Sequence, residues 1–242
     1  MWYKLTWAYI GQTKVRPSGW WGWQPWVNTM AYWKFDWNLT DETWNMTATW
    51  SWIQYWTVGT KHYVENTATG TSCVITVNWN GLSQIWSWDF CVSFWGYIPS
   101  GLSARIPNFF WEWYNWATPR PWPIVRALGN DWGKIEWCTD GYTTASTTST
   151  YLWQWTYITF TRLSWVCYCY INSTQITTIN DSTDLSLWTD HVFYLMWRLG
   201  FNDGTRPVTW ARMSELIYEK QWWSSQYVSD YFNDTKADYW IS

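Results

Sequence analysis

Four tryptophans gathered in one short segment are the residues of this sequence best suited to hold a ligand. They lie in the run Gly19-Trp20-Trp21-Gly22-Trp23-Gln24-Pro25-Trp26. Glycine and proline disfavour a regular strand there, and a surface loop cannot easily bury four large rings. The flat face of an indole suits the apolar C–H face of a pyranose, and an amide side chain can hydrogen-bond the sugar hydroxyls. We therefore expect carbohydrate binding by Trp20, Trp21, Trp23, Gln24 and Trp26, with a subunit interface or internal packing as the alternatives.

Two further tryptophans flank or interrupt a proline-rich run, Thr118-Pro119-Arg120-Pro121-Trp122-Pro123. Prolines cannot donate to a sheet ladder, so this run is expected in a loop or at a sheet edge. Trp116 and Trp122 have no inward strand face to occupy there. We therefore add both to the candidate ligand-binding residues.

Glu112 and Glu136 are candidate catalytic carboxylates. Glu112 lies between two tryptophans of a predicted strand, and Glu136 lies between an isoleucine and a tryptophan. Glycoside hydrolysis needs two such groups, about 5–5.5 Å apart to retain the anomeric configuration and about 6.5–9.5 Å apart to invert it. Strand alternation points both side chains away from the neighbouring rings, so the alternative is a pair of solvent-facing glutamates. No catalytic role is assigned to either residue.

Metal and cofactor chemistry finds little support in the sequence. His62 and His191 are the only histidines, and the pair Cys167-x-Cys169 has no second matching pair. No glycine-rich phosphate loop or dinucleotide fingerprint occurs. We expect neither a metal nor a cofactor.

Composition narrows the partners and the location. The net charge is −3 and only 14% of the residues are charged, which argues against a nucleic-acid groove. No stretch approaches about 18 apolar residues, so no membrane span is expected. No signal peptide is visible in Met1–Val15, but sequons of a kind typical of secreted proteins begin at Asn38, Asn45, Asn172, Asn180 and Asn233. An extracellular or virion-surface location is therefore favoured.

The five cysteines, Cys73, Cys91, Cys138, Cys167 and Cys169, cannot all pair within one chain. Cys167 and Cys169 lie two apart on one predicted strand, with about 6.6 Å between their Cα atoms, which is a poor geometry for a bridge. We expect mainly buried free thiols, with at most one disulfide.

Alternation with a period of two is the dominant pattern and predicts strands. The predicted strands cover 3–9, 33–39, 44–58, 73–79, 85–95, 109–116, 135–139, 151–160, 163–171 and 191–199. Along 44–58 the inward face would carry Trp44, Trp50, Trp52 and Trp56. The dipeptide Asn80-Gly81 is a strong turn signal, so 72–95 is expected to form one antiparallel hairpin.

Helical spacing occurs only near the C-terminus. Thr209 would cap one helix, which includes Met213 and Leu216, and Ser225 would cap a second, which includes Phe232.

These patterns predict an all-β fold: a two-sheet antiparallel sandwich, jelly-roll-like, with a short helical segment near the C-terminus and residues 1–242 in a single domain. The chain carries 31 Trp but an ordinary apolar fraction of 48%, so most rings should replace aliphatic core residues. The first hypothesis is a non-enzymatic, lectin-like protein whose exposed tryptophans stack on a glycan. The alternatives are a homo-oligomeric structural protein, such as a viral capsid or coat subunit that binds copies of itself, and a glycoside hydrolase.

Overall fold

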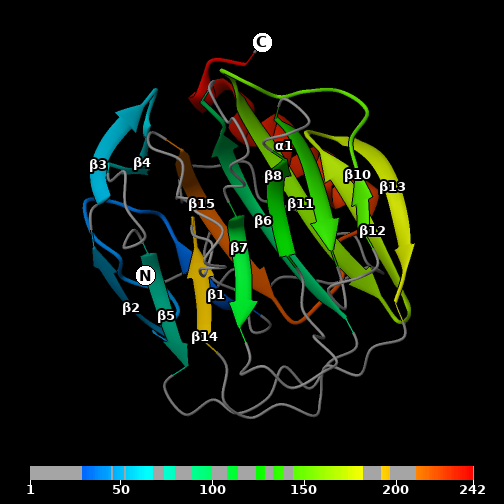
Figure 1. Ribbon diagram of the computed structural model, residues 1–242, viewed down its shortest axis with the longest axis horizontal. Helices are drawn as coiled ribbons and strands as arrows, with labels where there is room; N and C mark the ends of the chain where they lie inside the picture. Colours follow the sequence, from blue (N-terminus) through cyan, green and yellow to red (C-terminus); the bar gives the residue numbers. More distant parts are fainter. Residues whose placement is uncertain are drawn as a thin grey trace, which may run out of the picture.

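Two antiparallel β-sheets make up most of the chain, as predicted, and Figure 1 shows them facing one another. The computed structural model describes residues 29–44, 46–51, 53–67, 74–79, 89–99, 108–113, 124–128, 133–138, 144–181, 192–196 and 211–241. The large sheet holds β1 (Thr29–Trp33), β3 (Ile53–Val58), β4 (Lys61–Asn66), β6 (Phe90–Tyr97), β11 (Trp155–Leu163), β12 (Val166–Ile171), β13 (Thr174–Asn180) and β15 (Arg212–Glu219). The small sheet holds β2 (Met46–Ser51), β5 (Val74–Trp79), β7 (Asn108–Trp113), β8 (Ile124–Leu128), β9 (Lys134–Cys138), β10 (Thr144–Ser146) and β14 (Val192–Leu195).

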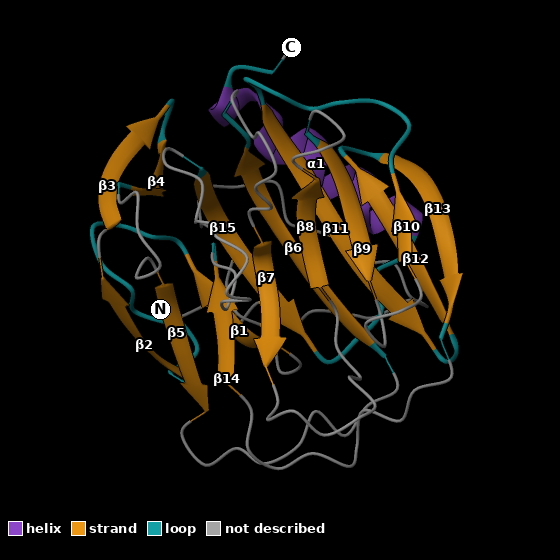
Figure 2. Cartoon of the chain, viewed as in Figure 1, coloured by secondary structure: helices purple, strands orange, loops and turns teal. Residues whose placement is uncertain are grey.

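The strand order decides which strands lie at the edges. The large sheet runs β13-β12-β11-β6-β15-β4-β3, with β1 also paired to β15, and the small sheet runs β10-β9-β8-β7-β14-β5-β2. Thus β3 and β2 are edge strands, and Figure 2 shows them on the same side of the sandwich.

The two sheets share one hydrophobic core. The large sheet contributes residues such as Phe94 and Ile158, and the small sheet contributes Val77 and Trp137. The ring of Phe94 on β6 lies 5.4 Å from that of Phe109 on β7, centroid to centroid. Burial of apolar area between the sheets, at roughly 25 cal/mol per Å², therefore holds the sandwich together.

A second aromatic layer lies on the opposite face of the large sheet, under α1 (Ser225–Thr235) and the 3₁₀ turn η2 (Lys236–Tyr239). We call it the helix-covered layer; its rings include Trp95, Tyr157, Trp223, Tyr231, Phe232 and Tyr239. The ring of Trp95 stacks on that of Tyr239 at 4.2 Å, and the ring of Tyr157 stacks on that of Tyr231 at 5.5 Å. Because core and helix cover both faces of β6 and β11, almost every residue of these strands is buried.

The predicted hairpin over 72–95 is wrong. Strand β5 pairs with β2 and β14 in the small sheet, whereas β6 pairs with β11 and β15 in the large sheet. The turn signal Asn80-Gly81 lies outside the described residues. Two strands next to each other in sequence can join different sheets of a sandwich, and alternation along each strand does not reveal which sheet it joins.

The predicted continuous strand over 44–58 is also divided between the sheets, into β2 and β3. Its supposed inward face is partly exposed: Trp44, Trp50 and Trp56 are all exposed tryptophans. The strands predicted over 109–116, 135–139 and 191–199 correspond to β7, β9 and β14, and those over 151–160 and 163–171 form the hairpin of β11 and β12.

Residues 33–39 do not form the predicted strand. Phe35 and Trp37 have positive φ angles of 59° and 61°, which break an extended conformation. The chain turns instead around the buried carboxylate of Asp41. That carboxylate accepts hydrogen bonds from the backbone N–H groups of Tyr32, Thr43 and Met46, at 2.8, 3.0 and 3.0 Å.

One of the two predicted helices is confirmed and the other is wrong. The second helix is α1, with Ser224 rather than Ser225 as its cap; the Ser224 hydroxyl accepts the Tyr227 N–H at 3.2 Å. The segment around Met213 and Leu216 is β15, which is buried along nearly its whole length. A strand buried on both faces does not alternate, so its apolar residues can fall at helical spacing by accident.

Four cysteines, Cys91, Cys138, Cys167 and Cys169, are free and buried, as expected for most of the thiols, and Cys73 lies outside the described residues. In the ranges that the structure describes, no helix has the length and apolar character needed to cross a membrane.

Candidate functional site

The structure does not describe the tryptophans that the sequence singled out. Trp20, Trp21, Trp23, Gln24, Trp26, Trp116 and Trp122 all lie outside the described residues. Their role in ligand binding stays a prediction.

The strand register does not bring Glu112 and Glu136 together. Glu136 on β9 lies opposite Arg126 on β8, which lies opposite Asn108 on β7, about four residues from Glu112. With about 3.4 Å per residue along a strand and about 4.8 Å between strands, the two Cα atoms are about 17 Å apart. The expectation that Glu136 faces solvent is wrong: it is buried, and its carboxylate forms an ion pair with the Arg126 guanidinium.

A different site arises where β15 changes its neighbour. The first part of β15 pairs with β4, up to Met213 opposite Val64, and the last part pairs with β1, from Leu216 opposite Trp33. Glu215 lies between these two pairings, in a β-bulge, with a φ of 48°. Bulges redirect side chains and interrupt pairing. The bulge places the Glu215 carboxylate in a pocket at the junction of β1, β4 and β15.

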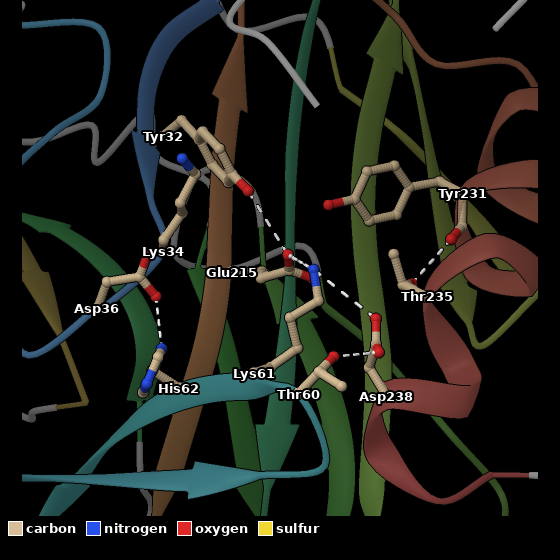
Figure 3. A pocket seen from close by; sticks show the side chains of 10 residues that line it. All are labelled: Tyr32, Lys34, Asp36, Thr60, Lys61, His62, Glu215, Tyr231, Thr235 and Asp238. Carbon is tan, nitrogen blue, oxygen red and sulfur yellow. Dashed lines mark hydrogen bonds and ion pairs between the residues drawn. The ribbon is translucent and has the colours of Figure 1, made fainter. Parts of the chain in front are cut away.

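The pocket has a volume of about 350 Å³, within the range of about 300–1,000 Å³ that is usual for small-molecule sites. Segments far apart in sequence form its walls: β1 and the chain after it, the β3–β4 turn, β15, and the α1–η2 region (Figure 3). Its lining is mainly polar. The lining residues are Tyr32, Lys34, Asp36, Thr60, Lys61, His62, Glu215, Tyr231, Thr235 and Asp238.

Lys61 and Glu215 form the centre of the polar network. The Lys61 Nζ lies 2.6 Å from Glu215 Oε1 and 3.7 Å from Asp238 Oδ2. The Tyr32 hydroxyl donates to Glu215 Oε1 at 3.5 Å, and the Tyr239 hydroxyl donates to Glu215 Oε2 at 3.3 Å. Glu215 is almost fully buried, so these donors compensate the loss of water around its charge.

Asp238 is held in place by the β3–β4 turn. The Thr60 hydroxyl donates to the Asp238 carboxylate. Next to it, Gly59 has a φ of 52°, and a Cβ added there would lie 2.0 Å from the Asp238 carbonyl oxygen. Only glycine permits this backbone conformation and this close approach together. The turn and η2 are therefore positioned against each other by a single glycine.

Two further groups reach the pocket from opposite walls. The His62 Nδ1 lies 2.6 Å from Asp36 Oδ1. The Tyr231 side chain points its hydroxyl into the pocket (Figure 3), and that hydroxyl has no hydrogen-bond partner within the part of the chain that the structure describes. A buried phenol without a partner is a donor that remains available to a ligand.

Burial fixes the protonation of the pocket phenols. Desolvation, followed by repulsion from the Glu215 charge, raises the pKa of Tyr32, Tyr231 and Tyr239 well above the ordinary value. At neutral pH these hydroxyls are therefore protonated donors. For Lys61, burial lowers the pKa, but the attraction of Glu215 outweighs it and raises the pKa overall, so the amine is charged.

A row of two exposed tryptophans and one half-buried tyrosine leads to the pocket; we call it the aromatic strip. It consists of Trp50 on β2, Tyr55 on β3 and Trp37 after β1, with Tyr55 at 6.4 Å from each tryptophan. The Trp37 ring lies 5.5 Å from the imidazole of His62, which lines the pocket. Trp37 and Trp50 expose 59% and 54% of their surface. The strip thus joins the two edge strands and ends at the polar pocket.

This arrangement can bind a polar ligand that has one apolar face. The pocket offers carboxylates, an ammonium group, phenols and hydroxyls, and the strip offers flat rings beside them. No group of three or more histidine, cysteine or acidic side chains is placed to hold a metal among the residues described.

None of the residues that line this pocket was among the candidate site residues predicted from the sequence. Because residues of β15 fall at helical spacing, we predicted a helix there and did not expect Glu215 to lie in a β-bulge. The available signal is that Glu215 is the only acidic residue in the run 211–218, since an isolated carboxylate among core residues usually has a specific partner. That partner, Lys61, lies on another strand and cannot be identified from local sequence.

No protein-family model matches the chain, and no curated protein matches its sequence. Its structure is similar to several solved structures. The receptor binding domain of botulinum neurotoxin C/D mosaic serotype has a TM-score of 0.63 and 14% identity over 86% of this chain and 51% of that chain. The botulinum neurotoxin serotype D ligand binding domain in complex with N-acetylneuraminic acid has a TM-score of 0.63 and 14% identity over 86% of this chain and 50% of that chain. Trypanosoma rangeli sialidase in complex with a difluoro-KDN compound has a TM-score of 0.67 and 10% identity over 88% of this chain and 34% of that chain.

At these identities the likeness concerns the fold alone. The chain spans about half the length of the neurotoxin domains and about a third of the sialidase.

Proposed function

We propose that this protein is a non-enzymatic carbohydrate-binding β-sandwich whose glycan site is the Glu215 pocket together with the aromatic strip. One observation carries the proposal: a polar pocket with buried hydrogen-bonding groups opens beside a row of exposed rings. Sugars combine hydroxyl edges with apolar C–H faces, so they need both kinds of surface side by side.

Each part of the site has a distinct task. The carboxylates of Glu215 and Asp238 accept hydrogen bonds from sugar hydroxyls, and such charge-assisted bonds are about twice as strong as neutral ones. The Tyr231 hydroxyl donates to a ring or hydroxyl oxygen. Trp37 offers an exposed face on which a pyranose ring can stack.

The structural neighbours support this proposal without specifying a ligand. One was solved with N-acetylneuraminic acid and another with a sugar-acid derivative of KDN. The fold therefore occurs within proteins that were solved with sugar ligands, and the function of this chain has to be argued from its own site.

A glycan array probed with the folded chain tests the proposal, followed by titration of the best oligosaccharide. We expect Asp238→Asn to weaken its affinity about tenfold, because a neutral amide replaces a charged acceptor. The matched control is Asp230→Asn, which makes the same change at an exposed position of α1 outside the pocket lining. Absence of binding across the array, or equal losses in both variants, would contradict the proposal.

We also propose that residues 1–242 form a single domain, that Trp20, Trp21, Trp23, Gln24, Trp26, Trp116 and Trp122 bind ligand, and that copies of the chain associate. The last is motivated by exposed rings such as Trp44 and Trp240, since large apolar surface promotes association. Sedimentation at micromolar concentration tests it: a strict monomer contradicts association.

A further inference from the structure

We infer that the pocket selects a neutral, hydroxyl-rich sugar and discriminates against sugars that carry a carboxylate. The inference rests on the proposed function and specifies the class of glycan. Two properties of the pocket support it: the charge of its residues, and the hydrogen-bonding groups that are available to a ligand.

Negative charge outweighs positive charge at the pocket. Asp36, Glu215 and Asp238 line it, and the lysines that face them are Lys34 and Lys61. Just outside, Glu42 pairs with Lys34 at 3.3 Å. Four carboxylates therefore face two ammonium groups, with His62 against Asp36, and acidic side chains outnumber the lysines.

The two lysines are already committed to carboxylates of the protein. Lys61 lies between Glu215 and Asp238, at 2.6 and 3.7 Å, and Lys34 pairs with Glu42. No arginine lines the pocket, so its described lining lacks the forked donor that binds a carboxylate in a bidentate manner. A sugar carboxylate would have to compete with protein carboxylates for the same ammonium groups.

A neutral sugar carries no charge for these carboxylates to repel. Its hydroxyl groups both donate and accept, so they can donate to Glu215 and Asp238 and accept from Tyr231. The Tyr231 side chain is mostly buried, with 8% of its surface exposed, and its hydroxyl points into the pocket without a partner among the described residues (Figure 3). A single unpaired donor among several acceptors suits a polyol better than an anion.

The expected discrimination follows from the charge. An excess of carboxylates over ammonium groups about 8 Å from a ligand carboxylate, in a medium between protein and water, disfavours the anion by about tenfold. The effect should shrink as ionic strength rises, because the pocket opens to solvent.

Matched oligosaccharides with and without a terminal sialic acid test the inference. Lactose and N-acetyllactosamine, each alone and sialylated, are titrated into the intact chain beside a panel of other neutral hexose oligomers and their uronic-acid counterparts. We expect the neutral member of each bound pair to bind at least about tenfold more tightly. Equal or tighter binding of the acidic members overturns this inference and leaves the proposed function intact. Absence of binding to every member overturns both.

A charge variant provides a gain-of-function test. Glu42 does not line the pocket, so Glu42→Lys alters the charge beside it and releases Lys34 without removing a lining group. We expect the affinity for the acidic member of a pair to rise about tenfold, while the affinity for the neutral member stays within about twofold. If both affinities change alike, charge does not set the selectivity and the inference fails.

Discussion

The helix-covered layer and the aromatic strip are built from the same types of residue and have opposite surroundings. In the layer, Trp95 is fully buried and stacks on Tyr239 and Phe232. In the strip, Trp37 exposes 59% of its surface, and its ring is tilted against that of Tyr55 and T-shaped against that of His62, with no stacked neighbour among the described rings. The first arrangement stabilises the fold, and the second leaves ring faces available to a ligand.

The two regions differ because neighbouring elements bury one of them, and not because their residue types differ. Strand β6 lies in the middle of the large sheet, with the other sheet on one face and α1 on the other. Strands β3 and β2 lie at the sheet edges, where the described residues of α1 do not reach their rings. A described tryptophan is therefore structural or available for binding according to its position in the fold.

The largest expected effect is the loss of a ring from the helix-covered layer. Trp95→Ala should reduce the free energy of unfolding by about 3–5 kcal/mol, because a large cavity forms between β6 and α1. Urea unfolding measures it, with Trp153→Ala as the exposed counterpart, for which we expect less than about 0.5 kcal/mol. Equal losses in the two variants would contradict the distinction between buried and exposed rings.

A smaller effect is expected where the β3–β4 turn meets η2. Gly59→Ala should cost about 1–3 kcal/mol, because a Cβ at positive φ would collide with the Asp238 carbonyl. Asp238 would shift with η2, so glycan affinity should fall too. Thermal unfolding and titration together test this: unchanged affinity in a destabilised variant would show that the turn does not position the pocket.

The buried phenols predict a loss of stability at alkaline pH. Burial raises the pKa of Tyr157, Tyr231 and Tyr239 well above 10.0 in the folded protein, so the unfolded chain releases these protons at lower pH. The stabilisation that these protonated phenols contribute is fully present below about pH 10 and is lost as the pH rises towards their raised pKa in the folded protein. Each phenol contributes up to about 1.4 kcal/mol per pH unit.

Unfolding free energies measured between pH 8 and 11 test this prediction. Tyr239→Phe should reduce the decline above pH 10 by the contribution of one phenol, whereas Tyr55→Phe, on the half-buried ring of the strip, should reduce it less. Identical slopes in the two variants would argue against the buried layer as the source.

Local patterns of the sequence predicted what local forces determine. The presence of α1, the strands β11 and β12, and the abundance of strands follow from capping chemistry and alternation over a few residues. The pairing of β5 and β6 could not be predicted, because each strand finds its partner by packing between sheets. Likewise Glu215 depends on a bulge where β15 changes from β4 to β1, which is a property of three strands distant in sequence.

The sequence led us to expect exposed tryptophans in a binding role, which stays a prediction, and it did not identify the Glu215 pocket. Which rings remain exposed depends on the edge positions of β2 and β3, and on the positive φ of Trp37.

The central claim is tested most directly by comparing Trp37→Ala with Trp153→Ala in titrations against the neutral oligosaccharide that binds best. Both tryptophans expose 59% of their surface and have φ angles near 60°, but only Trp37 contacts a residue of the pocket. Stacking worth about 1–2 kcal/mol predicts a tenfold or greater loss of affinity for Trp37→Ala and less than about twofold for Trp153→Ala. Equal affinities for the two variants would contradict a glycan site at the aromatic strip.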